Sequence, residues 1–296
     1  MDNLIFIDTN ILLDFYRVRG GETALSLLNH IDGHHDKIIT SSQVEMEYKK
    51  NRQRVILQSL NMIKTPDWGG LAAPAFLSEA KPIEIIKKDQ EEITRQLKKV
   101  KTRIESVLKN PLLNDPVYKV LQRLFKNELK HNLSRDNKIR FEIRRLARKR
   151  FMLGYPPRKD NDISLGDAIN WEWIIHCAKD SKKDIVIVSR DSDYGVPYDK
   201  KPILNDWLSQ EFKSRVSKKR KIILTDKLAE AFKLTNISVS KQELDAEKKL
   251  IDQLLKQPTS LGDILNIKPP ATKLLELLKS FENENQRISE ISGSST

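Results

Sequence analysis

Five acidic residues of this sequence stand where predicted strands give way to helices. Asp8 directly follows one apolar run, and Glu47 lies on the helix expected after the next run. Asp191 and Asp193 follow a third run, and Asp167 opens a further helix. In an open parallel sheet the carboxyl ends of the strands face a common crevice, where ligands bind. We therefore expect these carboxylates to lie close together.

Such a group of carboxylates has a definite chemistry. The negative charges would repel one another strongly unless a cation neutralised them. Oxygen-only ligands suit Mg²⁺ or Mn²⁺ rather than Zn²⁺. A pair of such ions about 4 Å apart can hold a phosphodiester, generate hydroxide from bound water and stabilise the departing oxygen. The residues therefore predict metal-dependent hydrolysis of a phosphodiester.

Each acid also has an ordinary structural explanation. Asp8 could cap a helix, and Asp167 matches the last position of a capping box. Asp191 could simply flank a turn, and Glu47 could form half of a surface ion pair with Lys50. The functional interpretation is favoured because independent strand–helix junctions supply acids to the same edge of the sheet.

The sheet itself is predicted from short β-branched runs, each followed by helix-like sequence. This alternation is typical of repeated βα units, and it predicts an α/β fold with a parallel sheet covered on both faces. The four runs are Leu4–Ile7, Lys37–Thr40, Ile185–Val188 and Lys221–Leu224.

A basic segment interrupts the repeat. The chain has 296 residues and a net charge of +12, and residues 78–155 alone contain 21 Lys or Arg against 10 Asp or Glu. A positive surface attracts a polyanion, and nucleic acid is the obvious candidate, although such charge also solvates long helices. The expected nucleic-acid-binding residues are Arg144, Arg145, Arg148 and Lys149.

The same segment has a helical pattern. Apolar residues recur at three-, four- and seven-residue steps, which predicts a stripe that faces a partner helix; they are Ile86, Ile93, Leu97, Val100, Ile104 and Val107. Asn110-Pro111 and Asp115-Pro116 end this helix. Two further helices are expected, one containing Leu121, Leu124 and Leu129, the other Ile139, Ile143 and Leu146. We interpret the segment as a helical hairpin or small bundle leaning against the sheet domain.

The expected domains are a sheet domain over residues 1–240, with 78–155 as its insertion, and a C-terminal extension over 241–296. The extension should contain helices near Leu244–Leu255 and Lys273–Phe281, followed by a disordered Ser-rich end from about Asn283.

Several classes of protein are disfavoured. No apolar stretch approaches the roughly 20 residues that cross a bilayer. The first residues do not resemble a secretory signal, and the single cysteine, Cys177, excludes an internal disulfide or a multi-cysteine zinc site. The cytoplasm is the expected compartment, and no membrane partner is expected.

Four ordered acidic motifs resemble those of PIN-domain nucleases. They are Asp8-Thr9-Asn10, Val44-Glu45-Met46-Glu47, Gly166-Asp167-Ala168 and Ser189-Arg190-Asp191-Ser192-Asp193-Tyr194. Smaller details resemble the bacterial PIN-like group formerly called DUF4935, which also carries a long helical insertion: Phe15-Tyr16-Arg17, Gln43-Val44, Glu47-Tyr48, Asn51-Arg52 and Pro156-Pro157. The resemblance covers about residues 1–240.

The resemblance implies a three-layer α/β/α fold and a metal-dependent endoribonuclease that leaves a 5′-phosphate and a 3′-hydroxyl. It implies that Asp8, Glu47, Asp167 and Asp191 are catalytic metal ligands for Mg²⁺ or Mn²⁺. Asn10 would support the loop that carries Asp8. Ser189 and Asp193 would assist, Asp193 as a further ligand.

Two other functions are open at this point. The same chemistry could act on single-stranded or branched DNA, because metal-bound carboxylates act on the phosphate and not on the sugar. A non-catalytic nucleic-acid-binding module would keep the fold without the activity. The resemblance also suggests a toxin or phage-defence role, with an inhibitory or regulatory protein docking on the helices beyond Ser240, and a homodimer.

Overall fold

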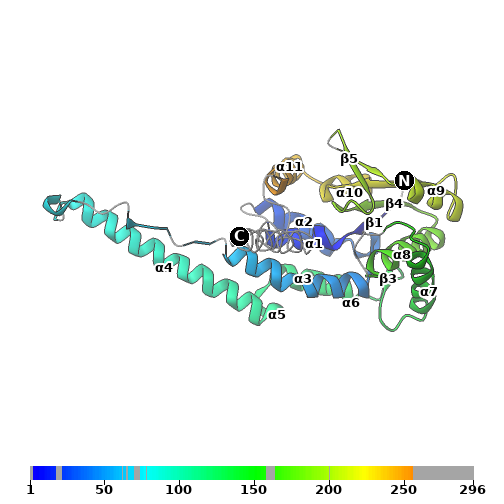
Figure 1. Cartoon of the computed structure of the whole chain (residues 1–296), viewed down its shortest axis with the longest axis horizontal. Coiled ribbons are helices and arrows are strands. Elements are labelled where there is room, and N and C mark those ends of the chain that lie inside the picture. Colours follow the sequence, from blue (N-terminus) through cyan, green and yellow to red (C-terminus); the bar gives the residue numbers. More distant parts are fainter. Residues whose placement is uncertain are drawn as a thin grey trace, which may run out of the picture. The chain divides into compact units, whose positions relative to one another are not determined.

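A computed structural model describes residues 3–17, 22–61, 63–64, 66–69, 74–77, 79–157, 164–199 and 201–255 (Figure 1). The chain divides into two compact units, Met1–Lys248 and Lys249–Thr296. The helix expected at Lys273–Phe281 and the Ser-rich end lie outside the described residues.

The core is a parallel sheet of five strands in the order β3-β2-β1-β4-β7. The central strands β1 (Asn3–Ile7) and β4 (Asp184–Val188) are buried along their whole length, so helices must cover both faces. The other strands are β2 (Ile38–Ser41), β3 (Asn132–Leu133) and β7 (Ile222–Thr225). All neighbours pair in parallel, which confirms the predicted α/β fold.

Two parts of the strand pattern were not predicted. β3 has two residues, too few to carry a periodic signal, and it joins the sheet edge from within the insertion. β5 (Gly195–Tyr198) and β6 (Lys201–Leu204) form a separate antiparallel hairpin. Each hairpin strand contains a proline, which normally argues against a strand except at an edge.

Helices pack on the sheet and on one another. The largest fully buried side chains include Trp171 and Trp173 of α8, a helix that contacts β2, β4, α3 and α7. α10 contacts β1, β4, β7 and α2. The helix bounds are α1 (Thr9–Arg17), α2 (Glu22–Gly33), α3 (Ser42–Asn61), α6 (Pro116–Lys126), α7 (Arg140–Met152), α8 (Gly166–Ser181), α9 (Asp206–Arg215), α10 (Leu228–Leu234) and α11 (Lys241–Leu255). Among the described residues, no helix is both long and apolar enough to span a membrane.

The insertion is not a single hairpin. Its first helix, α4 (Lys81–Lys109), has no buried residue, and the short α5 (Pro111–Asn114) follows it. α6 packs on α2 and β2, and α7 packs on α8. Leu129 lies outside α6, which ends at Lys126, so its predicted place on that helix was wrong. The structure therefore joins α6 and α7 to the sheet domain and leaves α4 uncovered by the described residues.

A buried ion pair fastens the insertion to α3. Arg52 and Asp115 are both almost fully buried, and the guanidinium Nε lies 2.9 Å from Asp115 Oδ2. The same carboxylate accepts a hydrogen bond of 2.7 Å from the Tyr16 hydroxyl, and Asp115 Oδ1 caps α6. Arg52 also donates to the carbonyl oxygen of Val107 near the end of α4. A buried charge pair of this kind is costly to break on one side.

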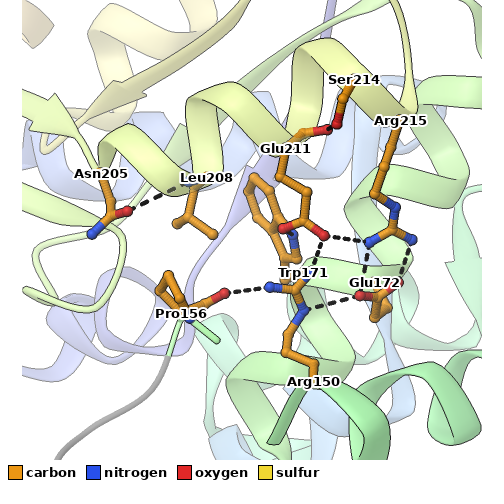
Figure 2. A network of polar contacts seen from close by, with 9 residues as sticks. All are labelled: Arg150, Pro156, Trp171, Glu172, Asn205, Leu208, Glu211, Ser214 and Arg215. Carbon is orange, nitrogen blue, oxygen red and sulfur yellow. Dashed lines mark hydrogen bonds and ion pairs between the residues drawn. The ribbon is translucent and has the colours of Figure 1, made fainter. Parts of the chain in front are cut away.

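A second buried network joins α7, α8 and α9 (Figure 2). Arg150 donates to Glu172 over 2.9 Å and forms an ion pair with Glu211. Arg215 bridges the same two carboxylates, and the Trp171 indole donates to Glu211. Arg150 is 3% exposed, so this cation of the basic insertion serves the fold and is not available to a polyanion.

Candidate active site

An acidic cleft of about 320 Å³ lies at the carboxyl ends of the central strands. Four of the predicted acids line it: Asp8, Glu47, Asp167 and Asp191. They come from the end of β1, from α3, from the first turn of α8 and from the segment after β4. The pairing of β1 with β4 brings Asp8 close to the segment that carries Asp191, because Ile7 of β1 lies opposite Val188 of β4.

Asp8 is held from several sides. Its backbone N–H donates to the carbonyl oxygen of Val188, which extends the β1–β4 ladder by one residue. Its carboxylate accepts hydrogen bonds from the Asn10 amide at 2.9 Å, from the Ser189 hydroxyl at 2.5 Å and from the Thr9 N–H at 2.6 Å. Asn10 and Ser189 thus both donate hydrogen bonds to the Asp8 carboxylate.

Burial and like charge make Asp8 an unusual acid. Its exposed fraction is 5%, and desolvation is the main cause that raises its pKa to about 7. The charges of Asp191 and Glu47 raise it further, and the Ser189 hydrogen bond opposes the shift. The carboxylates of Asp8, Asp191 and Glu47 are therefore close enough for their charges to repel one another, as expected of a site that binds a cation.

Glu47 is fixed in the cleft by two hydrogen bonds. The Thr9 hydroxyl donates to Oε2 at 3.0 Å, and the Gln43 amide donates to Oε1 at 2.7 Å. Gly166 permits this arrangement, since a Cβ there would stand 2.2 Å from Glu47 Oε1. Glycine thus lets the start of α8, with Asp167, approach α3 closely. In the part of the chain that the structure describes, no ion pair joins Glu47 to Lys50.

Asp191 is positioned through the same serine as Asp8. The Ser189 Oγ atom donates to Asp8 and accepts a hydrogen bond of 3.1 Å from the Asp191 N–H. The neighbouring Arg190 forms an ion pair with buried Asp14 of α1, which also binds Arg17 at 3.0 Å. These contacts fasten α1 to the segment that carries Asp191.

Asp193 is buried and does not line the cleft, unlike the other four acids. Its exposed fraction is 9%. Its neighbour Tyr194 is 1% exposed, and its hydroxyl has no hydrogen-bond partner among the described residues. The pKa of Tyr194 is raised by burial and then by the charges of Asp8, Asp167, Glu47 and Asp193. Asp193 is therefore close enough to the three cleft acids Asp8, Asp167 and Glu47 that all four charges act on the same buried tyrosine.

The donor atoms fit a hard divalent cation. Within the described ranges no three His, Cys, Asp or Glu side chains form a ready-made metal cage. Mg²⁺ does not need one, because it is often bound by one or two carboxylates and keeps several waters. The cleft supplies carboxylate oxygens, and the buried Oδ1 of Asn10 has no described hydrogen-bond partner. The chemistry of this set suits Mg²⁺ or Mn²⁺ and not a soft metal.

Three cations of the cleft were not predicted from the sequence. Arg17, Lys50 and Arg54 line it together with the acids. Lys50 and Arg54 follow Glu47 on α3 at three and seven residues, a helical spacing that places them on one face. That spacing was visible in the sequence as a signal. No such signal in the sequence pointed to Arg17. Its place in the cleft depends on the folded conformation of its side chain, which donates a hydrogen bond of 3.4 Å to the carbonyl oxygen of Asn10.

The predicted nucleic-acid-binding residues lie elsewhere. Arg144, Arg145, Arg148 and Lys149 line a second hollow of about 490 Å³ on α7, and none of them lines the acidic cleft. Apolar side chains share this hollow; they are Phe141, Met152 and Leu153, which are 63%, 84% and 52% exposed. We call this set the α7 face. The structure thus separates the predicted basic surface from the acidic cleft.

Comparison with protein families matches the PIN domain over residues 5–194. The matched range includes every acid of the cleft and the α7 face. The curated proteins and the solved structures gave no match to this chain.

Proposed function

The chain belongs to the PIN domain family, whose members are generally nucleases that use divalent metals, and we propose that it is an Mg²⁺- or Mn²⁺-dependent endoribonuclease. The acidic cleft would be its active site. The observation that carries the proposal is the convergence of Asp8, Glu47, Asp167 and Asp191 on one cleft, with the pKa of Asp8 raised to about 7 by burial and by two of these charges.

In this proposal some residues of the cleft bind the metal and others orient the metal ligands. Asp8, Glu47, Asp167 and Asp191 would hold the metal, which when bound polarises the phosphodiester and lowers the pKa of a water nucleophile. Asn10 and Ser189 fix the orientation of the Asp8 carboxylate. Thr9 and Gln43 fix that of Glu47. Such supporting hydrogen bonds keep ligands in place and tune their basicity.

The cations would bind the substrate. Arg17, Lys50 and Arg54 line the same cleft as the acids, where they can contact the phosphates that flank the bond to be cut. The exposed cations of the α7 face would bind the backbone at a distance from the cleft. Phosphate contacts position a strand but do not read its sequence, so this arrangement carries no base preference.

A cleavage assay tests the proposal. End-labelled single-stranded RNA and DNA of the same sequence are incubated with the full chain in Mn²⁺, Mg²⁺ or EDTA, beside an Asp8→Asn, Asp191→Asn variant. We expect internal cuts in RNA that require the metal and are lost in the variant. The products should carry a 5′-phosphate, which a phosphatase sensitivity assay detects.

The alternatives give different results. Metal-dependent cutting of DNA but not of RNA would replace the substrate and keep the chemistry. Binding of either strand without cutting in both metals would overturn the nuclease and favour a binding module. Equal cutting by the double variant would remove the acidic cleft from the mechanism.

A further inference from the structure

The α4 helix carries a heptad repeat. Apolar residues alternate at steps of three and four residues through 25 positions, which is the pattern of a coiled-coil seam. Assigned to the heptad, the a positions are Ile83, Gln90, Leu97 and Ile104, and the d positions are Ile86, Ile93, Val100 and Val107. Only Gln90 is polar, so seven of these eight positions are apolar.

The described part of the chain does not cover this seam. α4 has no buried residue, and the d-position side chains Ile86, Ile93 and Val100 are 37%, 43% and 45% exposed. A helix with no buried residue gains little from apolar residues at this spacing, because most helical stability comes from packing an apolar face. The pattern therefore calls for a partner helix.

The seam is complementary to itself when the partner runs in the opposite direction. If two copies of α4 cross at Arg95, each a position meets a d position: Ile83 meets Val107, Ile86 meets Ile104, Gln90 meets Val100, and Ile93 meets Leu97. Exposed apolar residues also occur beyond both ends of α4, at nearly equal numbers of residues along the chain from Arg95. They are Phe76 and Leu77 before α4, and Leu112 and Leu113 after it.

The charges favour the same orientation. Residues 81–94 contain three Lys and four Asp or Glu, whereas residues 96–109 contain five Lys or Arg and one Glu. An antiparallel pair sets the weakly negative half against the positive half, and it places Asp89 opposite Arg103 at the flanking g positions. A parallel pair would set the two positive halves side by side.

We propose that α4 is a self-association surface, on which a second copy of this chain docks its own α4 to form an antiparallel two-helix coiled coil. The occupant is a second copy because the repeat, the crossing point and the charge halves all match the helix itself. This dimer does not depend on the proposed nuclease activity.

Sedimentation equilibrium of the full chain tests the proposal. We expect wild type to have twice the 34.3 kDa chain mass at micromolar concentration. Ile93→Glu places a charge at the centre of the seam and should weaken self-association by about 100-fold or more. The matched control is Thr102→Glu, an equal change of charge at an outward f position, which should leave the dimer intact. Circular dichroism checks that both variants stay folded.

Cysteine cross-linking tests the direction. Residue 96 lies beside the crossing point, so Gln96→Cys should form a disulfide dimer only when the helices are antiparallel. Ile86→Cys should not, because its two copies would be about 27 Å apart in that arrangement. The single native cysteine, Cys177, is buried and does not compete. A monomeric wild type, or cross-linking of Ile86→Cys instead of Gln96→Cys, would overturn the proposal.

Discussion

The acidic cleft and the α7 face are both charged, but they are built in opposite ways. The cleft takes side chains from α1, α3, α8 and the segments after β1 and β4, and two of its acids, Asp8 and Glu47, are held by hydrogen bonds from distant parts of the chain. The α7 face takes all its cations from one helix, and they stand exposed. The first is a preorganised site, in which each group depends on others. The second is an additive surface, in which each charge acts almost alone.

The largest expected effect is therefore a single change in the cleft. Glu47→Gln should lower the rate of metal-dependent cleavage by about 10³-fold or more, because it removes a ligand charge worth several kcal/mol at the transition state. The matched control is Glu45→Gln, two residues earlier on α3, where the carboxylate accepts a hydrogen bond from Lys49 of the same helix and does not line the cleft. Equal loss in both variants would show that the cleft does not contain the reaction.

The next largest effect is expected on α7 itself, where a buried cation, Arg150, stands two residues from an exposed one, Arg148. Arg150→Met removes a buried cation from Glu172 and Glu211, and it should lower the free energy of unfolding by about 3 kcal/mol, because two carboxylates then share the single cation of Arg215. Arg148→Met, two residues earlier and exposed, should leave the unfolding midpoint in urea unchanged. A similar midpoint for both variants would mean that the network of Figure 2 does not stabilise the fold.

A smaller effect follows from the pKa of Asp8. Because it is raised to about 7, the metal-free carboxyl is largely protonated at pH 6 and largely ionised at pH 8. A metal must displace that proton, so the affinity for Mn²⁺ should rise up to about tenfold per pH unit below pH 7 and level off above it. Calorimetric titrations at pH 6, 7 and 8 measure this, and proton release measured in two buffers checks its origin. An affinity independent of pH would contradict the assigned shift.

The smallest effect per residue is expected on the α7 face. The triple change of Arg144, Arg145 and Arg148 to Glu should weaken binding to single-stranded RNA. It should also make the slope of log affinity against log salt less steep by about three, which is about one for each lost cation. The rate of cleavage at saturating RNA should stay unchanged, because none of these residues lines the cleft. Filter binding at several salt concentrations measures the slope, and intact affinity would remove the α7 face from substrate binding.

Much of the fold was visible in local patterns. The β-branched runs at Leu4–Ile7 and Ile185–Val188 predicted β1 and β4, because a strand buried on both faces must be apolar throughout. The end of β1 and the segment after β4 carried Asp8 and Asp191, so part of the cleft could be placed from topology alone. β3 could not, since a pair of residues gives no period and its place depends on the neighbouring strand β2.

What the sequence by itself determined is the set of residues whose local context is sufficient: four of the five parallel strands, the acids at their ends, and the heptad stripe of α4. What only the tertiary structure decided is which groups share a space. Arg17 joined the acidic cleft, Asp193 was buried outside its lining, and Arg150 was withdrawn into a buried network. The physical reason is that charge, spacing and propensity are properties of a segment, whereas burial and hydrogen-bond partners arise when segments far apart in the chain pack together.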